Sequence, residues 1–157
     1  MNFSKWSITQ PGKLNYAGTA DPASPFRILI LDDHKLFRSA ITDYCIRPFF
    51  KNVDLIEFEN GDKAFTFIKN EINQNNRIDL FITDINHPGQ KGQYLVKSIR
   101  FQELLSGNPT RIPIIILTMV AEGRFPELVT NNMVERYFTK ATKPEDIIDC
   151  IEEILFV

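Results

Sequence analysis

Two adjacent carboxylates, Asp32 and Asp33, end the apolar run FRILIL. A third carboxylate, Asp84, follows the run IDLFIT, and Thr118 and Lys140 close two later apolar runs. Carboxylates that crowd together raise one another's pKa unless a positive group lies between them. If these side chains meet, we expect a bound Mg²⁺, because this ion prefers a few carboxylates, carbonyl oxygens and retained waters.

Such a cluster suggests a particular chemistry. A cation, the Lys140 ammonium, the Thr118 hydroxyl and one free carboxylate together suit a phosphoryl group, whose equatorial oxygens need positive and hydrogen-bonding partners. Asp84 stands alone after its run and is the expected acceptor. The residues therefore predict phosphoryl transfer to an aspartate.

The order of apolar and amphipathic segments indicates how these residues are positioned. Apolar runs that are β-branched or aliphatic alternate with stretches of helical period. Strands are expected at 26–31, 53–58, 78–83, 112–117 and 134–138, and helices near 35–47, 61–74, 91–105, 122–132 and 144–155. Strands that are apolar on both faces indicate a parallel sheet covered by helices on both sides. We expect an α/β fold with a doubly wound five-stranded sheet in the order 2-1-3-4-5, which binds ligands beyond the carboxyl ends of its strands.

Composition sets the broad class. A length of 157 residues with 43% hydrophobic residues allows one domain with a full core. A net charge of -2 argues against nucleic-acid binding by this segment, because domains that hold phosphates are usually strongly basic. No apolar run is long enough for a membrane span or a signal peptide, so we expect a cytoplasmic protein. Cys45 and Cys150 lack metal-ligand spacing and are expected to be reduced core thiols.

Residues 1–25 differ from the rest of the chain. They mix proline and glycine with small polar residues and show neither helical nor strand period. We interpret them as an N-terminal arm that precedes one domain at 26–157. Trp6 and Tyr16 are aromatic residues of the kind that dock onto a surface, either of the same protein or of a partner.

Four motifs in this order resemble the receiver domains of two-component response regulators. They are ILDDH, ITDINHPGQKG, the IILT that ends the fourth run, and YFTKATKPEDI, within a resemblance that covers residues 26 to 156. LDDHKLFRSAI, together with Pro144 four residues after Lys140, looks most like receivers of the LuxR/NarL type, which usually precede a helix-turn-helix DNA-binding domain in regulators of transcription. Whether the chain is a stand-alone receiver or part of a longer regulator stays open.

The resemblance implies a flavodoxin-like receiver fold and a role for each matching position. The residues of phosphoryl transfer would be Asp84, Thr118 and Lys140, the Mg²⁺ ligands Asp32, Asp33, Asp84 and the backbone carbonyl of Asn86, and the switch residues Thr118 and Tyr137. The protein would not be a conventional enzyme, because it would catalyse only its own Mg²⁺-dependent phosphorylation and dephosphorylation. Its partner would be a sensor histidine kinase or a phosphotransfer protein, and a homodimer is a further hypothesis.

Alternatives remain for single residues and for the whole chain. An isolated acidic pair often caps a helix, and an isolated Asp84 suits a turn. His34 and His87 lack metal-ligand spacing and are expected at the surface or at a helix start. His87 and Met119 depart from the residues usual in the family. The main alternative function is therefore a receiver-like binding module that is silent in phosphorylation.

Two other proteins with a related sheet fit less well. A flavodoxin-like electron carrier needs a glycine-rich and hydroxyl-rich phosphate loop after the first strand, where this chain places acid. A phosphatase with an aspartyl nucleophile would have an Asp-x-Asp arrangement there, whereas Asp32 and Asp33 are adjacent.

Overall fold

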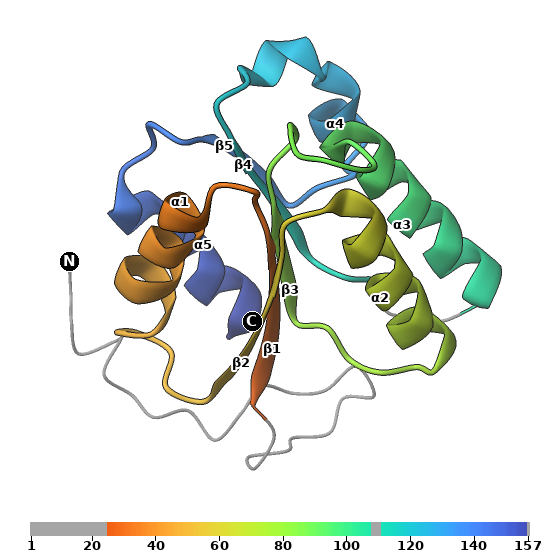
Figure 1. Cartoon of the computed structure of the whole chain (residues 1–157), viewed down its shortest axis with the longest axis horizontal. Coiled ribbons are helices and arrows are strands. Elements are labelled where there is room, and N and C mark those ends of the chain that lie inside the picture. The colour runs from red at the N-terminus through yellow and green to blue at the C-terminus, as the bar shows by residue number, and fades with distance from the viewer. Residues whose placement is uncertain (1–24, 108–110, 157) are drawn as a thin grey trace.

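A single parallel sheet organises the protein. The computed structural model describes residues 25–107 and 111–156. Its five strands are β1 (Phe26–Leu31), β2 (Val53–Phe58), β3 (Leu80–Thr83), β4 (Ile114–Thr118) and β5 (Arg136–Thr139). They pair in the order β2-β1-β3-β4-β5, all parallel, so the predicted fold class and strand order are confirmed (Figure 1).

Helices cover both faces of this sheet (Figure 1). One face carries α1 (Lys35–Ala40), the π-helical turns η2 (Ile41–Ile46) and α5 (Pro144–Leu155), and the other carries α2 (Gly61–Asn73), α3 (Gly92–Ser106) and α4 (Pro126–Thr130). Asn60 is the N-cap residue of α2, because its side chain accepts hydrogen bonds from the backbone N–H groups of Asp62 and Lys63. None of the helices in the described ranges is both long and apolar enough to cross a bilayer.

The core has two layers because alternate residues of each strand point to opposite faces. In β1, Ile28 and Ile30 pack in a cluster with Ile147 of α5, whereas Leu29 and Leu31 pack in the cluster of α2 and α3. Burying one such side chain contributes about 1.5–3 kcal/mol. Cys45 and Cys150 lie buried and free in the first cluster, as predicted, and burial raises the pKa of each thiol to about 11.

Most element limits match the prediction to within two residues, but the helix expected at 122–132 is wrong. The segment forms a single 3₁₀ turn, η3 (Glu122–Arg124), followed by the five-residue α4. Pro126 explains the break, since a proline disfavours helical geometry in the preceding residue and Phe125 has φ -129° and ψ 63°. The expected helix at 35–47 is likewise divided, between α1 and the π-helical turns. Nearly all of the expected arm at 1–25 lies outside the described residues.

Candidate functional site

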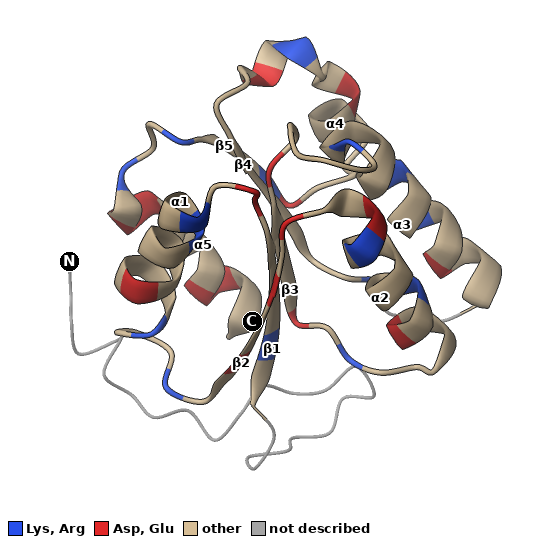
Figure 2. Cartoon of the chain, in the orientation of Figure 1, with Lys and Arg blue, Asp and Glu red and all other residues tan. Residues whose placement is uncertain are grey.

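Two buried carboxylates share one ammonium at the carboxyl end of the sheet. Asp32 follows β1 and Asp84 follows β3, and these neighbouring strands are in register at their last residues. Lys140 follows β5, and its Nζ lies 2.8 Å from Asp32 Oδ2 and 2.9 Å from Asp84 Oδ2. All three side chains are 7% or less exposed. The topology thus brings together three of the predicted site residues from the ends of three strands. Figure 2 shows acidic residues, in red, where the chain leaves β1 for α1.

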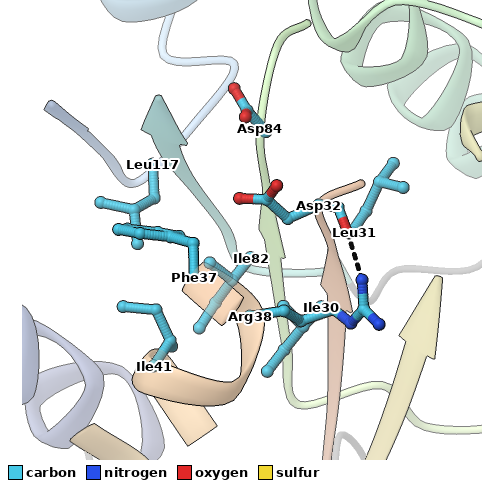
Figure 3. Close-up of a pocket in the computed structure, with 9 residues that line it drawn as sticks. All are labelled: Ile30, Leu31, Asp32, Phe37, Arg38, Ile41, Ile82, Asp84 and Leu117. Carbon is cyan, nitrogen blue, oxygen red and sulfur yellow. Dashed lines mark hydrogen bonds between the residues drawn. The ribbon is translucent and has the colours of Figure 1, made fainter. Parts of the chain in front are cut away.

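Backbone groups fix the other oxygen of each carboxylate. The His34 N–H donates to Asp32 Oδ1 at 2.8 Å, and the Ile85 N–H donates to Asp84 Oδ1 at 2.6 Å. Each carboxylate therefore has one oxygen on the backbone and one on Lys140. Figure 3 shows both carboxylates at the same end of a pocket whose other lining side chains are mostly aliphatic.

The ammonium of Lys140 stays charged in this position. Burial alone would lower the pKa of Lys140, but the hydrogen bonds and negative charges of Asp32 and Asp84 outweigh it, so the pKa is raised. The Nζ also lies 4.3 Å from the centre of the Phe37 ring, a cation–π distance. The site therefore holds a fixed positive charge beside Asp84.

Asp33 and His34 extend the acidic cluster to the surface. Both are exposed, and ligand atoms of Asp32, Asp33 and His34 lie within 4.8 Å of one another. His34 is the N-cap residue of α1, so its prediction as a helix-start residue is confirmed. The cluster thus combines Asp32, Asp33 and Asp84 with the single ammonium of Lys140.

Thr118 and Tyr137 contact the same loop residue. Thr118 is buried at the end of β4, and its Oγ1 accepts a hydrogen bond from the Val120 N–H at 3.3 Å. The Tyr137 hydroxyl donates to the Val120 carbonyl at 2.7 Å. Burial, then the charges of Glu122 and Asp84, raise the pKa of Tyr137 to about 12. The two predicted switch residues are therefore linked through one residue of the loop after β4, Val120.

Two predicted site residues are less directly connected. Within the described part of the chain, neither Thr118 nor Asn86 has a hydrogen bond or an ion pair with the Asp84 side chain. Asn86 is exposed in the loop after β3. The Thr118 carbonyl accepts from the Lys140 N–H at 2.8 Å, which ties the end of β4 to the start of the loop after β5.

The prediction for His87 is wrong, because this residue is buried rather than at the surface. It is 2% exposed, and its Cε1 would lie 2.8 Å from a Cβ added to Gly61. The loop after β3 packs against the start of α2, where the Gly61 N–H donates to the Pro88 carbonyl at 2.8 Å. The missing side chain at Gly61 leaves the space that His87 fills. Met119, in contrast, is 78% exposed.

Arg38 supports the site and was not predicted. Its guanidinium is buried and donates to the Asp32 carbonyl at 2.6 Å, the bond drawn in Figure 3. It also pairs with Glu57 at 2.9 Å and Glu59 at 3.1 Å, at the end of β2. The two glutamates flank Phe58 in the sequence, and this acidic strand end is a signal from which a nearby cation could have been predicted. Arg38 thereby holds the loop that carries Asp32.

Comparison with known families supports one assignment. The sequence model of the family described as "Response regulator receiver domain" matches residues 28–152. A chemotaxis protein CheY homolog of Campylobacter jejuni is 28% identical over 131 residues, which cover 82% of this chain and 92% of that protein. The glycerol metabolism activator of Pseudomonas putida is 28% identical over 130 residues, or 83% of this chain. The match spans only 54% of that activator's length.

The fold is also shared with solved structures. A DNA-binding response regulator of the LuxR family from Staphylococcus aureus superposes with a TM-score of 0.63 at 23% sequence identity. The superposition covers 82% of this chain and 98% of that structure. At this identity the similarity concerns the fold, which agrees with the strand order described above.

Proposed function

This chain belongs to the response regulator receiver domain family, and we propose that Asp84 is the residue on which it accepts a phosphoryl group. The observation that carries the proposal is the position of Lys140, whose Nζ lies 2.9 Å from Asp84 Oδ2 inside a buried acidic cluster. A carboxylate with a fixed cation beside it has a partner ready for the charge that a phosphoryl group brings.

The proposed reaction is a displacement at phosphorus. A carboxylate oxygen of Asp84 attacks the phosphorus of a phosphohistidine, and a P–O bond forms as the P–N bond breaks. The electron pair of that bond stays on the histidine nitrogen, which then takes a proton. Lys140 pairs with the phosphoryl oxygens, and the bond from the Ile85 N–H holds the other carboxylate oxygen in place. Water later attacks the phosphorus, the P–O bond to Asp84 breaks, and inorganic phosphate leaves as the carboxylate is restored.

The residues present fit Mg²⁺. Its ligands would be the carboxylates of Asp32, Asp33 and Asp84 and the backbone carbonyl of Asn86, all of them the hard oxygen atoms that this ion prefers. The charges support this proposal, because Asp32 and Asp84 share one ammonium and the carboxylate of Asp33 lies beside Asp32. A bound Mg²⁺ would supply positive charge to the phosphoryl oxygens during transfer.

We further propose that phosphorylation acts on the loop after β4. A phosphoryl group on Asp84 offers strong acceptor oxygens to the Thr118 hydroxyl. If Thr118 turns toward them, its oxygen releases the Val120 N–H, and the Tyr137 hydroxyl loses its fixed partner on the same residue. The output surface would be formed by β4, α4 and β5.

The partners follow from the same proposal. The phosphoryl donor would be a sensor histidine kinase or a phosphotransfer protein. We propose that the phosphorylated form dimerises through α4, β5 and α5 or through α1 and α5. Sedimentation should detect a dimer when a phosphate mimic is bound, whereas a monomer with and without the mimic would contradict this point.

Intact mass spectrometry tests the proposed function. The full chain is incubated with acetyl phosphate or phosphoramidate and Mg²⁺, beside Asp84→Asn, a chelator-treated sample and the control Asp43→Asn, which alters an exposed acid of η2. We expect one added phosphoryl mass in the wild type and in the control, and none in the other two samples. No adduct in the wild type, even with a cognate kinase, would identify a binding module that is silent in phosphorylation.

A further inference from the structure

The outer face of α3 carries an unusual set of exposed apolar side chains. Their exposed fractions are 58% for Tyr94, 61% for Phe101, 80% for Leu104 and 64% for Leu105. Spacings of seven and four residues place Tyr94, Phe101 and Leu105 along one side of the helix, and Leu104 flanks them. We call these four residues the α3 stripe.

The stripe is distinct from the face of α3 that forms the core. Leu95, Val96 and Ile99 are buried against the sheet and α2. The helix is therefore apolar on two sides, but the described residues of the chain cover only one. Large apolar side chains gathered in this way on an exposed helix surface generally mark a contact with another segment or another molecule.

A series of contacts through α2 connects the start of the described chain to α3. Pro25 precedes β1, and its carbonyl accepts from Arg77 Nη2 at 2.7 Å. Arg27 pairs with Glu71 in the last turns of α2 at 2.5 Å. Asn73, at the end of α2, then accepts from Gln102 of α3 at 2.9 Å. Contacts thus lead from the start of β1 to the residue beside Phe101, and α2 and α3 lie side by side in Figure 1.

The length and composition of the preceding segment suit this surface. Residues 1–24 can span about 80 Å when extended, whereas a domain of this size has a radius of gyration of about 14 Å. They carry only three charged residues, and their large apolar residues include Phe3, Trp6, Ile8, Leu14 and Tyr16. Residues 1–24 are therefore long enough to reach the α3 stripe and apolar enough to cover it.

The small size of the stripe favours a tethered segment over a second copy. Four partly exposed side chains present on the order of 500 Å², whereas a stable interface buries about 800 Å² on each partner. A tether raises the effective concentration of its segment to the millimolar range, so a smaller contact area suffices.

We propose that residues 1–24 fold back over the α3 stripe, with the Trp6 indole as the anchor against Phe101 and Leu105. This contact covers the second apolar side of α3. It involves none of the residues proposed for phosphoryl transfer, so it can fail or hold independently of the proposed function.

Fluorescence of the full chain tests this proposal, because Trp6 is its only tryptophan. We expect emission at shorter wavelength, and weaker quenching by acrylamide, than in the urea-unfolded chain. The double variant Phe101→Ser and Leu105→Ser should give the wavelength and quenching of the unfolded chain. The control Tyr44→Ser, which removes a 72% exposed aromatic residue from the opposite layer, should leave the signal unchanged.

Three results would overturn the proposal. In the first, Trp6 of the native wild type is quenched by acrylamide as strongly as in urea. In the second, Trp6 is still protected from quenching in the double variant. In the third, the protection disappears on dilution and sedimentation shows a dimer. The last result would assign the stripe to a second copy. Circular dichroism and urea unfolding check that the double variant folds, and hydrogen exchange in Trp6→Ser gives an independent readout, because the amides of α3 should then exchange faster.

Discussion

The two ends of the sheet both bury charged side chains, but they pair them differently. At the amino end, Asp79 is fully buried, accepts the Arg27 N–H at 2.9 Å and lies 3.1 Å from Arg77 Nε. Arg27 in turn pairs with Glu71. Each carboxylate in this group faces a guanidinium, and the hydrogen bonds connect β1 to α2 and to the segment before β3.

A second group at the amino end follows the same rule. Arg100 and Glu103 of α3 pair at 2.6 Å, and both side chains are nearly buried. Arg100 also donates to the carbonyls of Ile112 and Met133, each at 2.9 Å, before β4 and β5. Burial, opposed by the attraction of Arg100, raises the pKa of Glu103. This pair joins one helix to two strand starts.

The carboxyl end has an excess of negative charge instead. Asp32 and Asp84 share one ammonium, that of Lys140, and Asp33 lies beside Asp32, exposed to incoming ions. Paired charges hold elements together, whereas an acidic site with too few cations favours the binding of more. The difference explains why we assign chemistry to one end and structure to the other.

The largest expected effect is on phosphoryl transfer at the carboxyl end. Lys140→Met removes the positive charge beside Asp84, and loss of one such partner typically lowers a rate by about 10²–10³. The rate of phosphorylation by phosphoramidate should fall accordingly in a time course of intact masses. Lys143→Met, which alters an exposed lysine three residues later, is the control and should keep the wild-type rate. An unchanged rate in Lys140→Met would contradict the role of this residue.

At the amino end, the corresponding change should affect stability. Arg100→Met leaves Glu103 buried without its partner, so the free energy of unfolding should fall by about 3 kcal/mol. Urea unfolding measures the loss, and the folded variant should phosphorylate at the wild-type rate. The control Arg136→Met breaks an exposed pair with Glu153 and should change the free energy by less than about 1 kcal/mol. A slower phosphorylation in Arg100→Met would contradict the assignment of chemistry to the carboxyl end of the sheet and of stability to the amino end.

Mg²⁺ should stabilise the protein through the carboxyl end alone. An ion that binds only the folded state adds roughly 2.7 kcal/mol to the free energy of unfolding at one hundred times its Kd. Asp33→Asn should lose most of this gain in urea unfolding with Mg²⁺ compared with chelator, because one proposed ligand is missing. Asp54→Asn, which alters a partner of Arg27 at the amino end, should retain it. Equal stabilisation in both variants would place the ion elsewhere.

The smallest effect concerns Tyr137 and alkaline pH. The fold raises the pKa of this phenol from 10.0 to about 12, so it favours the protonated form. Its contribution to stability is complete below pH 10 and is lost as the pH rises toward 12. In Tyr137→Phe, the free energy of unfolding should not show this decrease between pH 10 and 12. At neutral pH it should be lower than in the wild type by about 1 kcal/mol, because the hydrogen bond to Val120 is missing. Urea unfolding of both proteins over this range provides the test, and identical pH profiles would contradict it.

The sequence predicted the fold well because its signals are local. Residues 26–31 and 53–58 are apolar runs whose limits agree with β1 and β2, and right-handed crossovers leave few orders for five such strands. The helix at 122–132 was wrong although its signal was also local, because Pro126 lies inside the segment.

The site was predicted only as far as strand ends determine it. Asp32, Asp84 and Lys140 meet because each follows a strand of one parallel sheet. The burial of Arg38 and His87 depends on packing between distant segments, namely Glu57 and Glu59 for the first and Gly61 for the second. Neither burial has a periodic signature in the sequence.

The position of the phosphoryl group tests the central claim most directly. The phosphorylated chain is reduced with borohydride, which converts an aspartyl phosphate to homoserine, and the modified residue is located by mass spectrometry of peptides. We predict homoserine at position 84 and at no other aspartate, with a yield that depends on Mg²⁺. Homoserine at Asp32 or Asp33, or a phosphoryl mass that resists reduction, would contradict the assignment of Asp84 as the acceptor.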